Sequence, residues 1–91
     1  MSIVVRFAPE SATTEQYDEV VRLLEADGHL SPDGQDYHVA FVIDGNLRVS
    51  EIWDSQKQFE AHGQDLMPVL EKVGIDPGQP EIHQVHNVFK R

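Results

Sequence analysis

The sequence predicts one α+β domain of the ferredoxin-like kind, a βαββαβ chain whose antiparallel sheet carries both helices on one face. Two segments have apolar residues at helical spacing, and four runs rich in β-branched and aromatic residues flank them in the matching order. An Asp44-Gly45 dipeptide joins the two middle runs, as in a two-residue hairpin turn. Residues 1–91 form a single domain in this prediction, because no linker, repeat or low-complexity segment divides them.

The first strand and the first helix are recognised by their composition and their ends. Residues 3–8 are rich in β-branched and aromatic side chains, which favour a strand. Thr13 and Gln16 have capping-box spacing before a run of apolar residues at helical period, and Gly28 provides a stop. We therefore expect a helix over residues 14–27.

A β-hairpin is expected over residues 37–43 and 46–53. If its turn is the two-residue kind, Ile43 lies opposite Asn46, and counting back along both strands puts His38 opposite Glu51. The register therefore makes this histidine and this glutamate direct cross-strand neighbours.

The second helix begins after Ser55, which has capping-box spacing to Gln58, and ends at Gly74. Its apolar stripe consists of Phe59, Leu66, Leu70 and Val73. Pro68 lies inside this helix, and because proline lacks a backbone donor we expect a kink or a break there. Residues 81–89 form the last predicted strand.

The hairpin register leaves both faces of the sheet substantially apolar. One face carries Tyr37, Val39, Phe41 and Ile43. The other carries His38, Ala40 and Val42 beside Leu47, Val49, Glu51 and Trp53. One layer of helices covers only one face, and an uncovered apolar patch of this size marks an interface. We expect a homodimer that forms through the sheet face.

The composition excludes several classes of partner. Seven basic residues against sixteen acidic ones give a formal net charge of −9, which repels nucleic acid and anionic membranes. The absence of cysteine excludes disulfides, thiolate nucleophiles and cysteine metal sites. No apolar stretch is long enough to span a membrane. We expect a cytoplasmic protein that binds neither nucleic acid nor membrane.

One segment resembles a known family. Residues 51–62, EIWDSQKQFEAH, are similar to the end of the third strand and the start of the second helix in the antibiotic-biosynthesis monooxygenase-like (ABM-like) family of dimeric α/β barrels. In that family an aromatic-ended strand leads into a phenylalanine-alanine-histidine helix. The resemblance implies a ferredoxin-like subunit, a homodimer that closes a barrel through its sheets, and a pocket between helices and sheet.

The activities that this resemblance implies are diverse. They include cofactor-free oxygenation of polyphenols, quinol oxidation and haem degradation. Haem-degrading members use an asparagine on the first strand, with a tryptophan and a histidine further on. Trp53 and His62 resemble the latter two, but residues 3–8 contain no asparagine and the tryptophan-to-histidine spacing is one residue shorter. Haem degradation is therefore disfavoured.

Two groups of side chains are candidates for the pocket. Trp53, together with Phe59 and Leu66, is the predicted substrate-binding wall, where the indole would stack on a planar ligand. The alternative for Trp53 is core packing. His62 is expected to point inward from the second helix, either as a base for a phenol or quinol or merely hydrogen-bonded in place.

His38 and Glu51 form the second candidate catalytic group. The carboxylate would fix the imidazole tautomer and make an oriented base, or the two would form a cross-strand pair that only stabilises the hairpin. His83 and His86 point to opposite faces of a strand, so one strand cannot chelate a metal with both. We predict no metal and no cofactor, although a metal assembled from scattered histidines stays open.

Two functions fit these residues. The first is a cofactor-independent monooxygenase-type enzyme for a small planar phenolic or quinol substrate, in which the substrate supplies the electrons to O₂. The second is a non-catalytic, dimeric small-ligand-binding or accessory protein. An open cavity that touches Trp53 and His62 favours the first function, and side chains that fill this volume favour the second.

Overall fold

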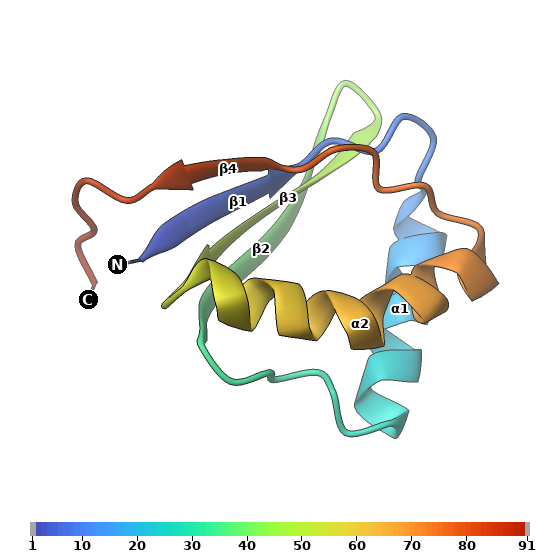
Figure 1. The fold of residues 1–91 in the computed structure, drawn as a ribbon. Coiled ribbons are helices and arrows are strands. Elements are labelled where there is room, and N and C mark those ends of the chain that lie inside the picture. The colour runs from blue at the N-terminus through green and yellow to red at the C-terminus, as the bar shows by residue number, and fades with distance from the viewer. Residues whose placement is uncertain (1, 91) are drawn as a thin grey trace.

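The computed structural model describes residues 2–90 and contains six elements in the predicted order (Figure 1). The elements are β1 (Ile3–Phe7), α1 (Thr14–Ala26), β2 (Gln35–Ile43), β3 (Asn46–Trp53), α2 (Gln56–Val73) and β4 (Glu81–Gln84). The strands form one antiparallel sheet in the order β2-β3-β1-β4, and both helices lie on one side of it. The predicted ferredoxin-like fold is confirmed. In the described residues, neither helix combines the length and apolar character needed to cross a bilayer.

The helix ends follow the capping signals of the sequence. Thr13 and Gln16 form a complete capping box at the start of α1, and the Ser55 side chain accepts a hydrogen bond from the backbone of Gln58 at the start of α2. Helix α2 ends at Gly74, whose φ of 90° places it in the left-handed region that favours glycine.

Of the kink or break predicted at Pro68, the break does not occur, because α2 runs without interruption through this residue. A proline removes one backbone donor and leaves the carbonyl four residues earlier, that of Gln64, without its helical partner. Both Gln64 and Pro68 are exposed, so water can reach the carbonyl. The helix therefore tolerates the proline on its solvent side.

The hairpin has the predicted register. Ile43 pairs with Asn46 and His38 pairs with Glu51, while Asp44 and Gly45 both have positive φ angles of 51° and 80°. Two consecutive positive φ angles define the turn whose twist matches that of the flanking strands. The β2 strand is longer than predicted and begins at Gln35, with a bulge between Gln35 and Tyr37.

The last strand is shorter than predicted, because β4 ends at Gln84 rather than at residue 89. Within residues 2–90 this strand pairs with β1 alone, and Gln84 lies opposite Ile3, where β1 begins. One further bond, from the Val85 amide to the Ser2 carbonyl at 3.0 Å, completes the ladder. The described pairing with β1 therefore ends at Val85, short of the predicted end of the strand.

The apolar side chains on the helix side of the sheet form two separate clusters. One joins the helices and is built from Val20, Leu24, Val69 and Leu70. The other joins the sheet to the start of α2 and is built from Ile3, Val5 and Trp53, with Phe59 packed against it. Helix α2 contributes to both clusters, with its first turns on the sheet and its later turns on α1. Helix α1 therefore packs mainly against α2, and a space remains between the helices and the sheet.

Candidate functional site

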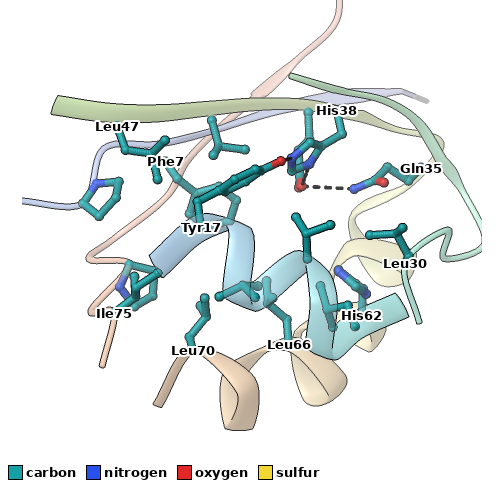
Figure 2. A pocket seen from close by; sticks show the side chains of 17 residues that line it. Phe7, Tyr17, Leu30, Gln35, His38, Leu47, His62, Leu66, Leu70 and Ile75 are labelled. Atoms are coloured by element: carbon teal, nitrogen blue, oxygen red, sulfur yellow. Dashed lines mark hydrogen bonds and ion pairs between the residues drawn. The ribbon is translucent and has the colours of Figure 1, made fainter. Parts of the chain in front are cut away.

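A cavity of about 300 Å³ lies between the two helices and the sheet (Figure 2). Most of its wall is apolar, including Phe7, Val20, Leu24, Leu47, Leu66 and Leu70. Its polar side chains are Tyr17, Gln35, His38, Glu51 and His62. This volume is at the small end of the range for ligand sites, and an apolar wall with a few convergent polar groups is typical of them.

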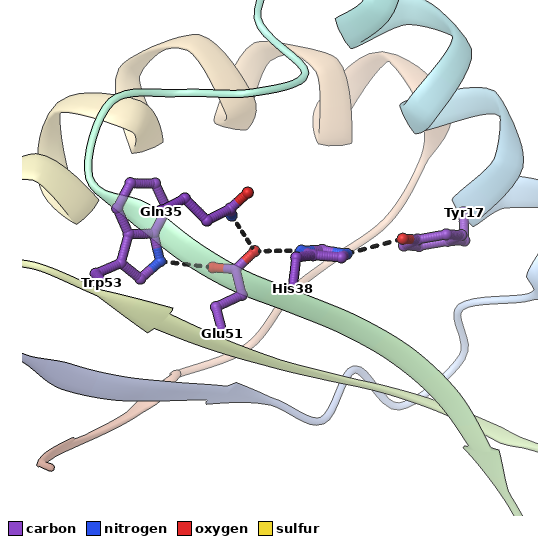
Figure 3. A network of polar contacts seen from close by, with 5 residues as sticks. All are labelled: Tyr17, Gln35, His38, Glu51 and Trp53. Atoms are coloured by element: carbon purple, nitrogen blue, oxygen red, sulfur yellow. Dashed lines mark hydrogen bonds and ion pairs between the residues drawn. The ribbon is translucent and has the colours of Figure 1, made fainter. Parts of the chain in front are cut away.

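Glu51 is the centre of a hydrogen-bond network at the sheet side of this cavity (Figure 3). One carboxylate oxygen accepts bonds from His38 Nδ1 at 2.7 Å and Gln35 Nε2 at 3.0 Å, and the other accepts from Trp53 Nε1 at 2.9 Å. The glutamate is only 4% exposed, and a buried carboxylate is tolerated only when such donors satisfy it. The network therefore fixes the Glu51 side chain in one position.

His38 is oriented by this carboxylate. Because a carboxylate only accepts, the proton of a neutral His38 lies on Nδ1 and leaves Nε2 as an acceptor. Nε2 lies 2.8 Å from the Tyr17 hydroxyl, and the two rings stack with centroids 6.0 Å apart and planes 22° from parallel. Tyr17, His38 and Glu51 thus form a continuous chain from α1 across β2 to β3.

Burial keeps the Tyr17 side chain in its neutral hydroxyl form. Desolvation raises the pKa of Tyr17 above 10.0, and the negative charges of Glu51 and Asp18 raise it further. A neutral tyrosine beside the unprotonated Nε2 of His38 acts as the donor. The tyrosine hydroxyl therefore donates to His38, and His38 donates to Glu51.

His62 projects into the cavity from α2 and is 7% exposed. Its Nδ1 is buried and has no hydrogen-bond partner among the described residues, while its ring packs against Trp53 with centroids 5.4 Å apart. Burial lowers the pKa of His62 below 6.5, against the opposing effect of the Glu51 and Asp65 charges. The imidazole is therefore neutral at pH 7, and it presents an unused polar atom.

Of the three predicted substrate-binding residues, one lines the cavity and two pack beside it. Leu66 lines the cavity, whereas Trp53 is fully buried and belongs with Phe59 to the packed cluster beside it. The Trp53 and Phe59 rings meet edge to face at 5.8 Å. In this conformation Trp53 packs the core and holds Glu51, and direct ligand contact by Trp53 or Phe59 stays a prediction.

The predicted pairing of His38 with Glu51 is confirmed, and the cavity brings this pair together with His62. Their catalytic roles stay predictions. Sequence reasoning missed Tyr17 and Gln35. In the sequence Tyr17 belongs only to the run of apolar residues of the first helix, and its contact with His38 depends on where that helix lies over the sheet. Gln35 precedes the bulge and lies outside residues 37–43, for which the sequence predicts the strand.

Comparisons with known proteins bear on the fold. No protein-family model matches the chain, and no curated protein matches it in sequence. Solved structures match over nearly the whole length. A candidate antibiotic biosynthesis monooxygenase from Nitrosomonas europaea has a TM-score of 0.66 and 14% identity, covering 96% of this chain and 100% of that chain.

Two further structures give the same result. SnoaB, a cofactor-independent oxygenase from Streptomyces nogalater, has a TM-score of 0.65 and 12% identity, with coverage of 99% of this chain and 96% of its own. A candidate antibiotic biosynthesis monooxygenase from Deinococcus radiodurans has a TM-score of 0.64 and 14% identity, with coverage of 100% and 98%. The resemblance seen in residues 51–62 therefore extends to the fold, which this chain shares with two candidate antibiotic biosynthesis monooxygenases and with one cofactor-independent oxygenase.

Proposed function

We propose that this chain is a cofactor-independent, monooxygenase-type enzyme that oxidises a small planar phenol or quinol in the cavity between helices and sheet. One observation carries the proposal. Four of the polar side chains that line an otherwise apolar cavity join in one network, centred on a His38–Glu51 hydrogen bond of 2.7 Å. The fold shared with a cofactor-independent oxygenase supports the same reaction class.

A quinol can react in such a site because it supplies its own electrons. Loss of a hydroxyl proton to a base gives an electron-rich phenolate, which reacts with O₂. One oxygen atom becomes bonded to a ring carbon, and the other leaves as water with two hydrogens of the substrate. The overall reaction, quinol plus O₂ to hydroxyquinone plus water, balances with O₂ as the only other reactant.

The protein would supply a base, an orientation and a dry environment. His38 is the base in this proposal, and Glu51 holds its tautomer and stabilises the imidazolium that forms. The apolar wall excludes water from the reacting ring. The unpartnered Nδ1 of His62 would bind a second oxygen of the ligand, because a neutral buried imidazole needs a partner.

A second candidate function is ligand binding without catalysis. It is favoured by one contact, the 2.8 Å bond through which the Tyr17 hydroxyl occupies Nε2 of His38. A base whose free nitrogen is already engaged is not directly open to a substrate. In this case the protein would bind phenols in the cavity without consuming O₂.

The two functions are separated by incubating the protein with quinols and polyphenols under ¹⁸O₂ and identifying the products by mass spectrometry. An enzyme gives a product with one ¹⁸O atom, and His38→Gln lowers the rate by about 10²- to 10⁴-fold, the usual contribution of a general base. His83→Gln, on an exposed histidine of β4, is the matched control and keeps the wild-type rate. Binding of these compounds with no labelled product from any of them would support the second function instead.

A further inference from the structure

We propose that Tyr17 is a further catalytic residue, whose hydroxyl binds the hydroxyl group of a phenolic ligand and relays the ligand's proton to His38. The proposal deepens the proposed function and rests on it for turnover, although ligand binding alone tests the contact. Tyr17 is the side chain by which α1 meets the His38–Glu51 pair, and it lines the cavity wall.

The hydroxyl of Tyr17 occupies Nε2 of His38. The two rings are stacked within 22° of parallel, and the tyrosine oxygen lies 2.8 Å from the nitrogen. The other ring nitrogen, Nδ1, is bonded to Glu51. Both nitrogens of the base are therefore engaged, and the hydroxyl of Tyr17, a residue of the cavity wall, is the end of the chain.

The hydroxyl of Tyr17 has hydrogen-bonding capacity that the described residues do not use. A phenolic hydroxyl has one donor and can also accept. The donor is used by His38, and among residues 2–90 the hydroxyl makes no other hydrogen bond. Its acceptor capacity is therefore free at the cavity wall, where the natural partner is an O–H group of a ligand.

Proton transfer from the ligand through Tyr17 to His38 conserves every proton. The ligand O–H bond breaks as its proton bonds to the Tyr17 oxygen, and the proton of Tyr17 moves to Nε2 of His38. Tyr17 is a neutral hydroxyl before and after, and it now donates to the ligand phenolate. The imidazolium formed at His38 faces the carboxylate of Glu51, which neutralises it.

The surrounding charges agree with this role. Burial raises the pKa of Tyr17, so the residue does not remain a tyrosinate after passing on the proton. The other titratable side chains at the cavity wall are Glu51, which is bonded to His38, and His62 on α2, whose pKa is lowered by burial. Neither competes with Nε2 of His38 for the hydrogen bond of Tyr17.

The relay defines the ligand by one chemical requirement, a free hydroxyl on a planar ring. A phenol donates to Tyr17 and ionises, whereas the methyl ether of the same phenol has no proton to give. The wild-type protein should therefore bind 4-nitrophenol about tenfold more tightly than 4-nitroanisole, because the ether cannot donate a hydrogen bond to the Tyr17 hydroxyl. This comparison needs no variant.

The direct test is the ionisation of bound 4-nitrophenol, followed by the absorbance of its coloured phenolate as pH is varied. In the wild-type protein Tyr17 donates a hydrogen bond to the phenolate, and Tyr17→Phe removes it while keeping the ring. We expect the phenolate-to-phenol ratio of the bound probe to fall about tenfold in Tyr17→Phe. Tyr37→Phe, which removes the hydroxyl of an exposed tyrosine on β2, is the matched control and leaves the ratio unchanged.

Each outcome decides the proposal. An unchanged ratio in Tyr17→Phe, equal binding of phenol and ether, or no binding of 4-nitrophenol by the wild-type protein would overturn it. Tyr17-dependent ionisation in a protein that oxidises no quinol leaves the relay standing and removes the proposed oxygenase function. Oxidation of quinols at equal rates by wild type and Tyr17→Phe leaves the enzyme standing and removes the relay.

Discussion

At the scale of single residues, the site depends on a carboxylate that is almost completely removed from water. Glu51 accepts three hydrogen bonds, and each of the three donors belongs to a side chain with another task. His38 carries the proposed base, Trp53 packs the sheet cluster, and Gln35 lines the cavity. A change at Glu51 therefore affects stability and chemistry together.

Glu51→Gln should destabilise the fold by about 2 kcal/mol or more. An amide offers one acceptor oxygen and turns its NH₂ group toward donors, so at least one buried donor loses its partner. Urea denaturation measures the change in the free energy of unfolding. Glu81→Gln, on an exposed glutamate of β4, is the control and should stay within about 0.5 kcal/mol of wild type. A variant at Glu51 as stable as the control would contradict the network.

His62 should make the protein less stable in mild acid. Burial lowers the pKa of His62 in the folded state below 6.5, so the unfolded chain binds the proton more readily. The contribution of His62 is complete above pH 6.5 and is lost as the pH falls from 6.5 through the folded pKa. Unfolding free energies measured from pH 7.5 to pH 5 should show a shallower fall for His62→Gln than for wild type. Parallel curves would mean that protonation of His62 does not lower the free energy of unfolding.

At the scale of elements, helix α2 is the part that connects the two apolar clusters. Its first turns pack on the sheet through Phe59, and its later turns pack on α1 through Val69 and Leu70. Between these contacts lies Gly63, a glycine in a helix interior with no heavy atom within 4 Å of the position of an added Cβ. Glycine at this position costs backbone entropy on folding, and the packing around the helix does not require a glycine there.

Gly63→Ala should stabilise the protein by about 0.5–1 kcal/mol, because alanine loses less backbone entropy in a helix. Gly74→Ala is the informative counterpart. Its φ of 90° is strained for any residue with a side chain, and the change should cost about 1 kcal/mol. Thermal unfolding should give a higher melting temperature for Gly63→Ala and a lower one for Gly74→Ala. Destabilisation by Gly63→Ala would show that the space at this position is not open.

The elements differ in how far the sequence determines them. The capping box at Thr13 and the turn at Asp44 are local signals, so the helix starts and the hairpin register followed from short stretches of chain. The His38–Glu51 contact followed from the same turn. The end of β4 depends on its pairing with β1, and the Tyr17–His38 contact depends on the position of α1 over the sheet. Neither could be predicted from the local sequence pattern.

At the scale of the whole molecule, one face of the sheet carries no helix. Phe41 and Ile52 on this face are only partly buried, and Tyr37 and Ile43 are 54% and 49% exposed. Apolar side chains grouped in this way on a small domain favour association, because covering them removes their surface from water. The expected homodimer through the sheet face remains a prediction.

Sedimentation equilibrium at micromolar concentration should give a dimer for the wild-type protein and a monomer for Phe41→Glu, which adds a charge to the uncovered face. Val42→Glu is the matched control, since Val42 is the next residue of β2, points to the helix side and is 52% exposed. It should remain a dimer. A monomeric wild type would contradict the predicted dimer. A dimer that survives Phe41→Glu would place the interface on another surface.

The position of the polar network along the chain also bears on how such a protein could diversify. Gln35, His38, Glu51 and Trp53 all belong to one hairpin, whereas most of the apolar cavity wall comes from the two helices and the segments next to them. The proposed base and most of the apolar wall thus lie in different stretches of sequence, and Tyr17 of α1 is the member of the network outside the hairpin. Substitutions in α1 and α2 can reshape the cavity for a new ring system while the hairpin keeps its imidazole and carboxylate in register. Duplicated copies of such a gene could therefore acquire new ligands through amino-acid substitutions in the two helices.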